Sequence, residues 1–321
     1  MASYLARARP DVYGPGHGRY QPSRFRPDGD DQLPRVNGVR PGERAVFDGA
    51  AGKIVGDRWD GVGEHRGAVL LLHGGGQTRH SWFRTAAALA DNGWTALALD
   101  ARGHGDSDWA PDGDYGIDGL VADLASVVGA LEERPLLIGA SMGGMTSLVA
   151  QGERGDVARA LVLVDIVPRA EPAGVARIMA FMSANPDGFG SLEEVAEAVR
   201  AYNPHRKRAP TPEGLRKNVR QRENGRWYWH WDPAFLQIDS EPRRSTSHER
   251  AAAAARRITV PTLLVRGEQS DIVSDEGVAE FLELIPGSRH VDVSATGHMV
   301  AGDDNDAFTS TVLGFLADSD I

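Results

Sequence analysis

Gly139-Ala140-Ser141-Met142-Gly143 forms a G-x-S-x-G motif between a predicted strand, Pro135–Gly139, and a predicted helix, Met142–Gln151. In this strand–turn–helix context the serine lies at the tip of a sharp turn, and crowding at the turn requires small neighbours. The same residues without the flanking strand and helix would indicate only a helix-capping serine. We therefore predict that Ser141 is a catalytic nucleophile.

A serine hydroxyl is a weak nucleophile at neutral pH, so it needs a histidine base and a carboxylate that holds this base in one tautomer. His298 lies in Thr296-Gly297-His298-Met299, the loop after the strand expected at Arg289–Val293. The other downstream histidine considered, His290, lies at the start of that strand. We predict that His298 is the base.

The carboxylate has two main candidates. Asp271 follows the strand expected at Thr262–Val265, and its loop should share one edge of the sheet with the loop of His298. Asp165 ends the strand expected at Ala160–Val164, and its alternative role is to cap the exit of the chain from this strand. Asp271 is the predicted acid and Asp165 the alternative, with Glu268 and Asp275 as minor candidates.

A short apolar run, Ala68–His73, ends in three glycines, in the segment Leu72-His73-Gly74-Gly75-Gly76-Gln77. Glycines let the main chain approach a substrate closely, and backbone N–H groups stabilise the oxyanion of an acyl-transfer transition state. We predict the N–H groups of Gly75 and Met142 as the donors. A phosphate-binding loop is excluded because neither G-x-x-x-x-G-K-[ST] nor G-x-G-x-x-G is present. His73 and His104 are expected to brace loops by hydrogen bonding.

From Glu43 onward, apolar strands alternate with amphipathic helices, a pattern that predicts an α/β fold with a largely parallel, doubly wound sheet. We predict an irregular N-terminal extension over residues 1–42 and a core over residues 43–167 and 258–321. Residues 168–257 interrupt the alternation with helical stretches at Val175–Ser183, Leu192–Tyr202 and Thr211–Glu223. They predict a helical cap over the carboxyl ends of the strands, where ligands bind in such sheets.

Two features of the predicted cap bear on the substrate. Trp227, Trp229 and Trp231 lie within five residues, and together with Gly76 they are predicted to bind substrate. The small core of the cap itself is the alternative role of these tryptophans. From Pro168 to Arg250 there are 14 basic and 11 acidic residues, so the segment is positive although the chain has a net charge of −10. A positive cap favours a substrate with a carboxylate, whereas solvated arginines are the alternative.

Composition excludes several other classes of protein. The 321 residues include no cysteine, which removes disulfides and thiolate chemistry, and no histidine pair has metal-ligand spacing. The net charge of −10 argues against a nucleic-acid partner, and no apolar run is long enough for a membrane span. Met1–Pro10 lacks the apolar stretch of a secretory signal. We expect a cytoplasmic protein without a cofactor or metal, acting on a small molecule.

Five segments of the chain resemble the α/β-hydrolase superfamily. They are HGGGQ (73–77), DARGHGDSDW (100–109), GASMGG (139–144), the Asp271 loop and TGHM (296–299). The resemblance covers residues 43–321 and implies the α/β-hydrolase fold, with a helical cap inserted after the sixth strand. Such caps occur in lidded esterases, lactonases, carbon–carbon bond hydrolases and cofactor-free haloperoxidases. Epoxide hydrolases and haloalkane dehalogenases share this layout, but their nucleophile is aspartate, which Ser141 excludes.

The function that this resemblance implies is hydrolysis of a carboxylic ester through an acyl-enzyme on Ser141. Because of the positive cap and a distant similarity to monoalkyl phthalate hydrolases, we expect a monoester that bears a free carboxylate. Carbon–carbon bond hydrolysis, lactone hydrolysis and cofactor-free haloperoxidation with the same triad are alternatives. A ligand receptor that does not turn over is a further class. The sequence gives no indication of the oligomeric state.

Overall fold

The computed structural model describes residues 39–203, 211–237, 247–294 and 305–318. Their main feature is an eight-stranded sheet in the order β1-β2-β4-β3-β5-β6-β9-β10. The first two neighbouring pairs are antiparallel and all the others are parallel, which confirms the predicted mostly parallel sheet. The strands are β1 Glu43–Asp48, β2 Lys53–Trp59, β3 Gly67–Leu72, β4 Trp94–Leu99, β5 Leu136–Ala140, β6 Leu161–Val164, β9 Thr262–Gly267 and β10 Arg289–Val293.

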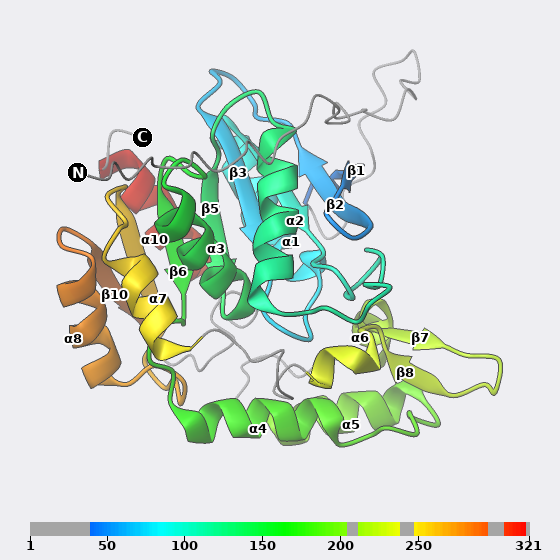
Figure 1. Cartoon of the computed structure of the whole chain (residues 1–321). Coiled ribbons are helices and arrows are strands. Elements are labelled where there is room, and N and C mark those ends of the chain that lie inside the picture. The colour runs from blue at the N-terminus through cyan, green and yellow to red at the C-terminus, as the bar shows by residue number, and fades with distance from the viewer. Residues whose placement is uncertain (1–38, 204–210, 238–246, 295–304, 319–321) are drawn as a thin grey trace, which may run out of the picture.

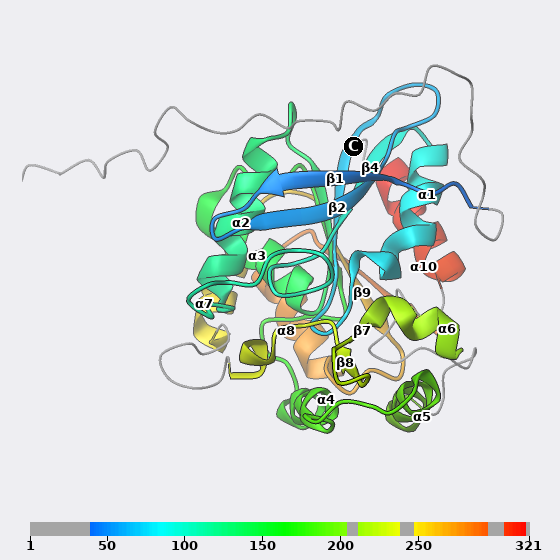
Figure 2. The same cartoon turned by 90° about the vertical axis from the view of Figure 1, so that its right-hand side faces the viewer.

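Both faces of this sheet are covered by helices, because strands β3, β5 and β6 consist of apolar residues and glycine. Along β3, Leu70 packs on one face, while Val69 and Leu71 pack on the other. Figure 2 shows α2, α3 and α7 on one side of the sheet and α1 and α10 on the other. The first face carries α2 Ile117–Gly129, α3 Met142–Arg154, α7 His248–Ala255 and α8 Asp275–Leu284; the second carries the 3₁₀ helix Arg79–Trp82, α1 Phe83–Asp91 and α10 Asn305–Asp318.

Between β6 and β9 the chain leaves the sheet and forms an insertion. In Figure 1, helices α4 and α5 of this insertion lie across the end of the sheet. Because the cap is inserted where β6 ends, it lies next to the carboxyl ends of the parallel strands, where loops of the core carry functional residues. The described elements are α4 Pro172–Ser183, α5 Leu192–Tyr202, α6 Pro212–Leu215, β7 Val219–Gln221, β8 Trp227–Trp229, and 3₁₀ helices at Arg216–Asn218 and Pro233–Gln237.

The insertion is not entirely helical, and this corrects the sequence-based expectation for Thr211–Glu223. Helix α6 ends at Leu215, and Val219–Gln221 pairs instead with Trp227–Trp229 as an antiparallel hairpin. Aromatic and β-branched side chains favour strands, and Asn224-Gly225 is a strong hairpin signal. Gly225 has φ +77°, which glycine adopts without steric cost. The Asn-Gly pair could have predicted this hairpin.

Helix α7 lies within the residues predicted as cap, but it packs against α3 of the core. The contact is close at Gly152, where an added Cβ atom would lie 2.1 Å from the carbonyl oxygen of Ala254. Ala251, Ala252, Ala254 and Ala255 are buried in the cluster that covers the sheet. Small residues on both helices therefore make α7 part of the layer over the sheet.

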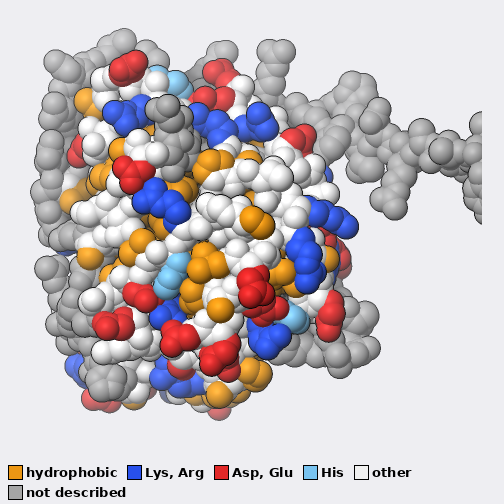
Figure 3. All heavy atoms as spheres, turned by 90° about the vertical axis from the view of Figure 1, so that its left-hand side faces the viewer, with side chains coloured by type: hydrophobic (Ala, Val, Ile, Leu, Met, Phe, Trp, Pro, Cys, Tyr) orange, Lys and Arg blue, Asp and Glu red, His pale blue; other side chains and the backbone are white. Residues whose placement is uncertain are grey.

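The surface next to α8 and β10 mixes charges of both signs, as Figure 3 shows. Arg266 pairs with Asp275 and Asp292, and Glu280 pairs with Arg169 and His248. Acidic and basic side chains therefore largely neutralise one another here. Among the helices of the described ranges, none combines the length and the apolar character that a transmembrane span requires.

Candidate active site

Ser141 lies at a sharp turn between β5 and α3. Its backbone has φ 46° and ψ −110°, a conformation that is strained for any residue other than glycine. The serine N–H donates to the Val164 carbonyl at 3.0 Å, and its own carbonyl accepts from Met145 N–H at 2.8 Å. Pairing with β6 on one side and the first turn of α3 on the other therefore hold this strained residue.

Glycines on both sides of Ser141 are required by close backbone approach. A Cβ atom added to Gly139 would lie 2.4 Å from the Gly143 carbonyl oxygen. One added to Gly143 would lie 2.4 Å from the carbonyl oxygen of Leu72, at the end of β3. Both clashes are with backbone, so no side-chain movement would relieve them.

The loop Gly74–Gly76, called here the oxyanion loop, lies directly beside Ser141. Gly143 N–H donates to the His73 carbonyl at 3.2 Å, and a Cβ atom added to Gly74 would lie 3.4 Å from Ser141 Cβ. The Gly74 carbonyl accepts from His73 Nδ1 at 2.8 Å and from Gln77 N–H at 3.0 Å. Since this carbonyl shares a peptide unit with the Gly75 N–H, these two bonds also fix the direction of that N–H.

Two backbone N–H groups at this site have no acceptor within the described part of the chain, those of Gly75 and Met142. By contrast, Gly74 N–H donates to Gln77 Oε1 at 2.9 Å, and Gly76 N–H donates to His104 Nε2 at 3.1 Å. The N–H of Met142 begins α3, where helix geometry leaves it without an intrahelical partner. These are the two donors that the sequence predicted for an oxyanion hole.

Behind the oxyanion loop lie His73, His104 and His230, called here the three-histidine cluster. The ring centroids are 5.2 Å apart for His73 and His104, and 5.7 Å apart for His104 and His230. In each ring one nitrogen accepts from a backbone N–H and the other contacts a backbone carbonyl. The N–H donors are those of Ala101 for His73, Gly76 for His104 and Gly105 for His230. The carbonyls are those of Gly74 for His73, Arg102 for His104 and Gly76 for His230.

These contacts require all three imidazoles to be neutral, because a protonated ring has no acceptor nitrogen. The rings are almost completely buried. Burial is the largest cause that lowers the pKa of each histidine, and for His104, which also lies next to His73, the pKa falls to about 3. The sequence predicted the bracing roles of His73 and His104, whereas it gave no role to His230.

Asp165 is fully buried at the end of β6 and has φ 50°. Its Oδ1 accepts from Gly267 N–H at 3.1 Å, and its Oδ2 accepts from Ser270 Oγ–H at 2.6 Å. Because Ala140 pairs with Val164, Ser141 and Asp165 end two neighbouring strands. A buried carboxylate thus lies one strand away from the predicted nucleophile.

Asp271, the predicted acid, has a different environment. Its side chain is 36% exposed, and Oδ2 lies 2.9 Å from the guanidinium of Arg177 on α4. The backbone of Asp271 also packs against Gly174 of the same helix. Asp271 thus joins the loop after β9 to the cap. The predicted base, His298, lies outside the described residues, so its distances to Ser141 and to either carboxylate are not described.

Apolar side chains of the cap cover the oxyanion loop. A Cβ atom added to Gly75 would lie 3.3 Å from Phe235, and one added to Gly76 would lie 3.1 Å from Met182 and 3.3 Å from Trp231. With Ile178, Phe181 and Trp229 they form one apolar cluster that also includes Met142. We call this cluster the roof of the site.

The three predicted substrate-binding tryptophans have different positions. Trp231 is buried in the roof, and Trp229 stacks on it with ring centroids 4.9 Å apart. Trp227 packs in a separate cluster within the cap, together with Phe189 and Leu215. Trp231 therefore lies next to the oxyanion loop with Trp229 stacked on it, whereas Trp227 belongs to the small core of the cap.

The arginines of the hairpin region are occupied by protein groups. Arg220 contacts Asp106 Oδ1 at 2.9 Å and donates to the Gly105 carbonyl at 3.1 Å. Arg226 donates to two carbonyls of the cap, those of Asp187 and Gly188. Arg216 and Arg222 lie over the rings of Trp227 and Tyr228. Arg206 and Arg208 lie outside the described residues.

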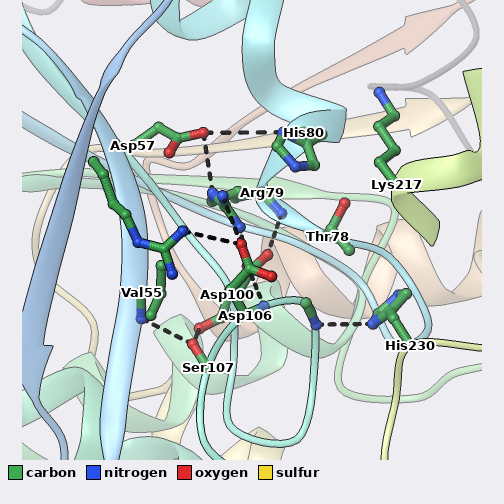
Figure 4. A network of polar contacts seen from close by, with 12 residues as sticks. Val55, Asp57, Thr78, Arg79, His80, Asp100, Asp106, Ser107, Lys217 and His230 are labelled. Atoms are coloured by element: carbon green, nitrogen blue, oxygen red, sulfur yellow. Dashed lines mark hydrogen bonds and ion pairs between the residues drawn. The ribbon is translucent and has the colours of Figure 1, made fainter. Parts of the chain in front are cut away.

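A buried ionic network supports the loops around the site (Figure 4). The guanidinium of Arg79 pairs with Asp57, Asp100 and Asp106, and its backbone N–H donates to Asp100 Oδ1 at 2.7 Å. Asp106 also receives Arg220 from the cap, so the network extends from the core sheet to the insertion. Within the described ranges, no three His, Asp or Glu side chains are grouped as a metal site requires.

Comparisons with known proteins agree with the fold described above. The alpha/beta hydrolase fold family matches residues 67–304. The esterase Rv0045c of Mycobacterium tuberculosis is 31% identical over 295 residues, covering 88% of this chain and 91% of that protein. The 3-hydroxybutyrate-oligomer hydrolase of Cupriavidus necator is 28% identical over 244 residues, covering 72% and 82%. The crystal structure of esterase Rv0045c aligns with a TM-score of 0.69 at 30% identity, covering 88% of this chain and 93% of that chain.

The lowered pKa of His104 predicts a dependence of stability on pH. The unfolded chain binds a proton near the ordinary pKa of 6.5, whereas the folded protein does so only near 3, so the unfolded state binds more protons between these values. The free energy of unfolding therefore falls as the pH drops through this window, by up to about 1.4 kcal/mol per pH unit for this one group.

His104→Gln, whose Oε1 can still accept from Gly76 N–H, should make this dependence shallower by about that amount. The slope of the free energy of unfolding against pH is measured by urea unfolding between about pH 6 and pH 4. Ser126→Ala on α2 provides the control: it removes no titratable group and should keep the slope of the parent protein. An equal slope in His104→Gln and the parent would contradict the prediction.

Proposed function

Since the chain belongs to the alpha/beta hydrolase family, we propose that it cleaves carboxylic esters through an acyl-enzyme on Ser141. The observation that carries this proposal is the position of Ser141 on a strained turn beside the N–H groups of Gly75 and Met142, which have no acceptor among the described residues. Donors held in advance where the oxyanion forms are a large source of rate enhancement in acyl transfer. The hydrolase activity of the relatives supports the same reaction class.

In the proposed mechanism, Ser141 Oγ attacks the ester carbonyl while His298 accepts the hydroxyl proton. The carbonyl oxygen becomes an oxyanion between Gly75 N–H and Met142 N–H. His298 then gives its proton to the departing alcohol, and a water activated by the same histidine releases the acid and restores Ser141. No step requires a metal or cofactor.

We propose that the carboxylate that orients His298 is Asp165, the alternative from the sequence, rather than Asp271. Asp165 is buried, fixed by Gly267 N–H and Ser270 Oγ–H, and placed on the strand next to that of Ser141. A triad carboxylate has to be fixed in direction, which such bonds favour. Asp271 is partly exposed and paired with Arg177, so its charge is already balanced by the cap.

For the substrate, we propose an ester with an apolar group against the roof and a free carboxylate. The apolar cluster of Met182, Trp231 and Phe235 beside the oxyanion loop supports the first part. The positive charge of the cap supports the second, as does the relative that hydrolyses 3-hydroxybutyrate oligomers, whose ester chains end in a carboxylate. Among the described cap arginines, Arg177 on α4 is next to the roof residue Ile178 and is half exposed.

Ser141→Ala should lower kcat for a p-nitrophenyl ester by about 10⁴-fold or more, because the residues of a triad act as a unit. A serine-directed phosphonate should inactivate the parent protein and add its mass to the peptide that contains Ser141. Ser126→Ala is the matched control and should keep parental kcat, since the Ser126 hydroxyl on α2 donates to the Ala122 carbonyl of its own helix. Turnover by Ser141→Ala above a few per cent would exclude the proposal, as would a single-turnover burst without steady state in the parent.

The two carboxylates are distinguished by Asp165→Asn and Asp271→Asn. We expect Asp165→Asn to lower kcat by about 10³- to 10⁴-fold, because the amide favours the wrong histidine tautomer. Asp271→Asn should stay within about 10-fold of the parent, since it removes a partly exposed ion pair. Steady-state kinetics with thermal unfolding as a folding check measures both. The reverse ranking would return the role to Asp271.

A half-ester of an aromatic diacid should be hydrolysed with a higher kcat/KM than the matching neutral diester, and added salt should reduce this preference by screening. Arg177→Gln and the pair Arg206→Gln with Arg208→Gln should each be tested for loss of the preference. Arg226→Gln is the control, because the Arg226 guanidinium donates to the cap carbonyls of Asp187 and Gly188. Equal hydrolysis of both esters by the parent would remove the carboxylate from the proposal and leave the esterase intact.

A further inference from the structure

His230 is a cap residue whose side chain reaches into the core. It follows β8 directly, its backbone N–H donates to the Asn218 carbonyl at 3.1 Å, and its side chain is buried. Nδ1 accepts from Gly105 N–H at 2.8 Å, a bond drawn in Figure 4. Because Nδ1 is the acceptor, the proton of the neutral ring is on Nε2, which lies 3.3 Å from the Gly76 carbonyl oxygen.

This second contact falls on the oxyanion loop. Gly76 has φ +74°, and both of its backbone polar groups are held by imidazoles, the N–H by His104 and the carbonyl by His230. On the other side, His73 holds the Gly74 carbonyl. The N–H of Gly75, which has no acceptor in the described ranges, therefore lies between backbone groups that three neutral histidines fix, and one of these histidines comes from the cap.

We propose that His230 is a positioning residue that aims the Gly75 N–H by holding the Gly76 carbonyl. The inference rests on the proposed esterase function, in which this N–H binds the oxyanion. The oxyanion develops only in the transition state, so a displaced donor should lower kcat and leave KM nearly unchanged. A glycine loop has little stiffness of its own, which is why external bonds to its carbonyls matter here.

The alternative role of His230 is simply to dock the cap, and the structure offers separate residues for that role. Arg220 joins the cap to the Gly105 carbonyl and to Asp106. Asp232 N–H donates to the Gly103 carbonyl at 2.9 Å, and the Asp232 carboxylate accepts from the Tyr115 hydroxyl. None of these contacts involves the oxyanion loop, so loss of docking and loss of loop position can be measured separately.

Two amide variants separate the two bonds of the imidazole. In His230→Asn the short side chain can place Oδ1 near the Nδ1 position and retain the Gly105 bond, but it cannot reach Gly76. In His230→Gln the longer side chain can place its NH₂ group near the Nε2 position and donate to the Gly76 carbonyl. Arg220→Gln is the docking control. Each variant is assayed on a neutral p-nitrophenyl ester, with thermal unfolding and phosphonate titration of reactive serine.

We expect His230→Asn to lower kcat by about 10- to 100-fold with KM within about twofold of the parent, a loss smaller than that for removing an oxyanion donor. His230→Gln should recover most of the lost kcat, and Arg220→Gln should keep parental kcat. Should His230→Asn fail to fold, His230→Ala with and without added imidazole replaces it, and imidazole should restore kcat.

Parental kcat in His230→Asn, or equal losses in the Asn and Gln variants, would overturn the positioning role. So would a loss in Arg220→Gln as large as that in His230→Asn, which would assign the effect to docking. If His230→Ala is used instead, a kcat that added imidazole does not change would overturn the positioning role of His230. If the parent shows no esterase turnover, or if Ser141→Ala retains it, the proposed function itself fails, and this outcome is distinct from the others.

Discussion

The close approach of β3, β5 and the start of α3 is the constraint on which the rest of the site depends. Gly143 lies against the Leu72 carbonyl, and Gly139 lies against Gly143, so three backbone segments meet with no room for a side chain. This crowding holds Ser141 at a positive φ and presents its side chain beside the loop that continues from β3. The bond from Gly143 N–H to the His73 carbonyl then fixes how the oxyanion loop leaves the sheet.

The loops around this turn are held in two physically different ways. Near the sheet edge, Arg79 and three aspartates form an ionic network in which neighbouring opposite charges compensate for burial. Next to the oxyanion loop, the three-histidine cluster uses neutral groups, each of which accepts one hydrogen bond and has a carbonyl partner for its N–H. A neutral ring binds backbone without adding a charge close to the place where an oxyanion is proposed to form. Because these rings must stay neutral, we expect the free energy of unfolding to fall as the pH drops.

The sequence predicted two of the elements named above with the bounds that the structure has, Leu192–Tyr202 and Arg289–Val293. The β7–β8 hairpin was missed because its strands are only three residues long and lie within a helical segment, so periodicity is uninformative there. His230 was missed for another reason: its partners are 125 and 154 residues away in the chain, and both bonds go to backbone groups that have no sequence signature.

The ranking of Asp165 and Asp271 shows the same limit of sequence reasoning. Spacing from the last strands favours Asp271, yet spacing does not reveal that Arg177 of the cap pairs with it or that Ser270 and Gly267 bond to Asp165. The first fact depends on where the insertion folds back onto the core, and the second depends on the pairing of β6 with β9. Position along the chain predicts which strand end carries a carboxylate, but not whether this carboxylate is buried and fixed or exposed and paired.

The cap contributes to the site through a division between polar and apolar contacts. Arg220, His230 and Asp232 bond to the loop after β4 and to the oxyanion loop, and these directional contacts set the distance between cap and core. Met182, Trp231 and Phe235 then fill the space over Gly75 and Gly76. Apolar side chains exclude water from this space, and hydrogen bonds to a developing charge are stronger where water is excluded. In the hairpin region, Arg220 joins the cap to the core and Arg226 bonds carbonyls within the cap, while the apolar roof covers the oxyanion loop.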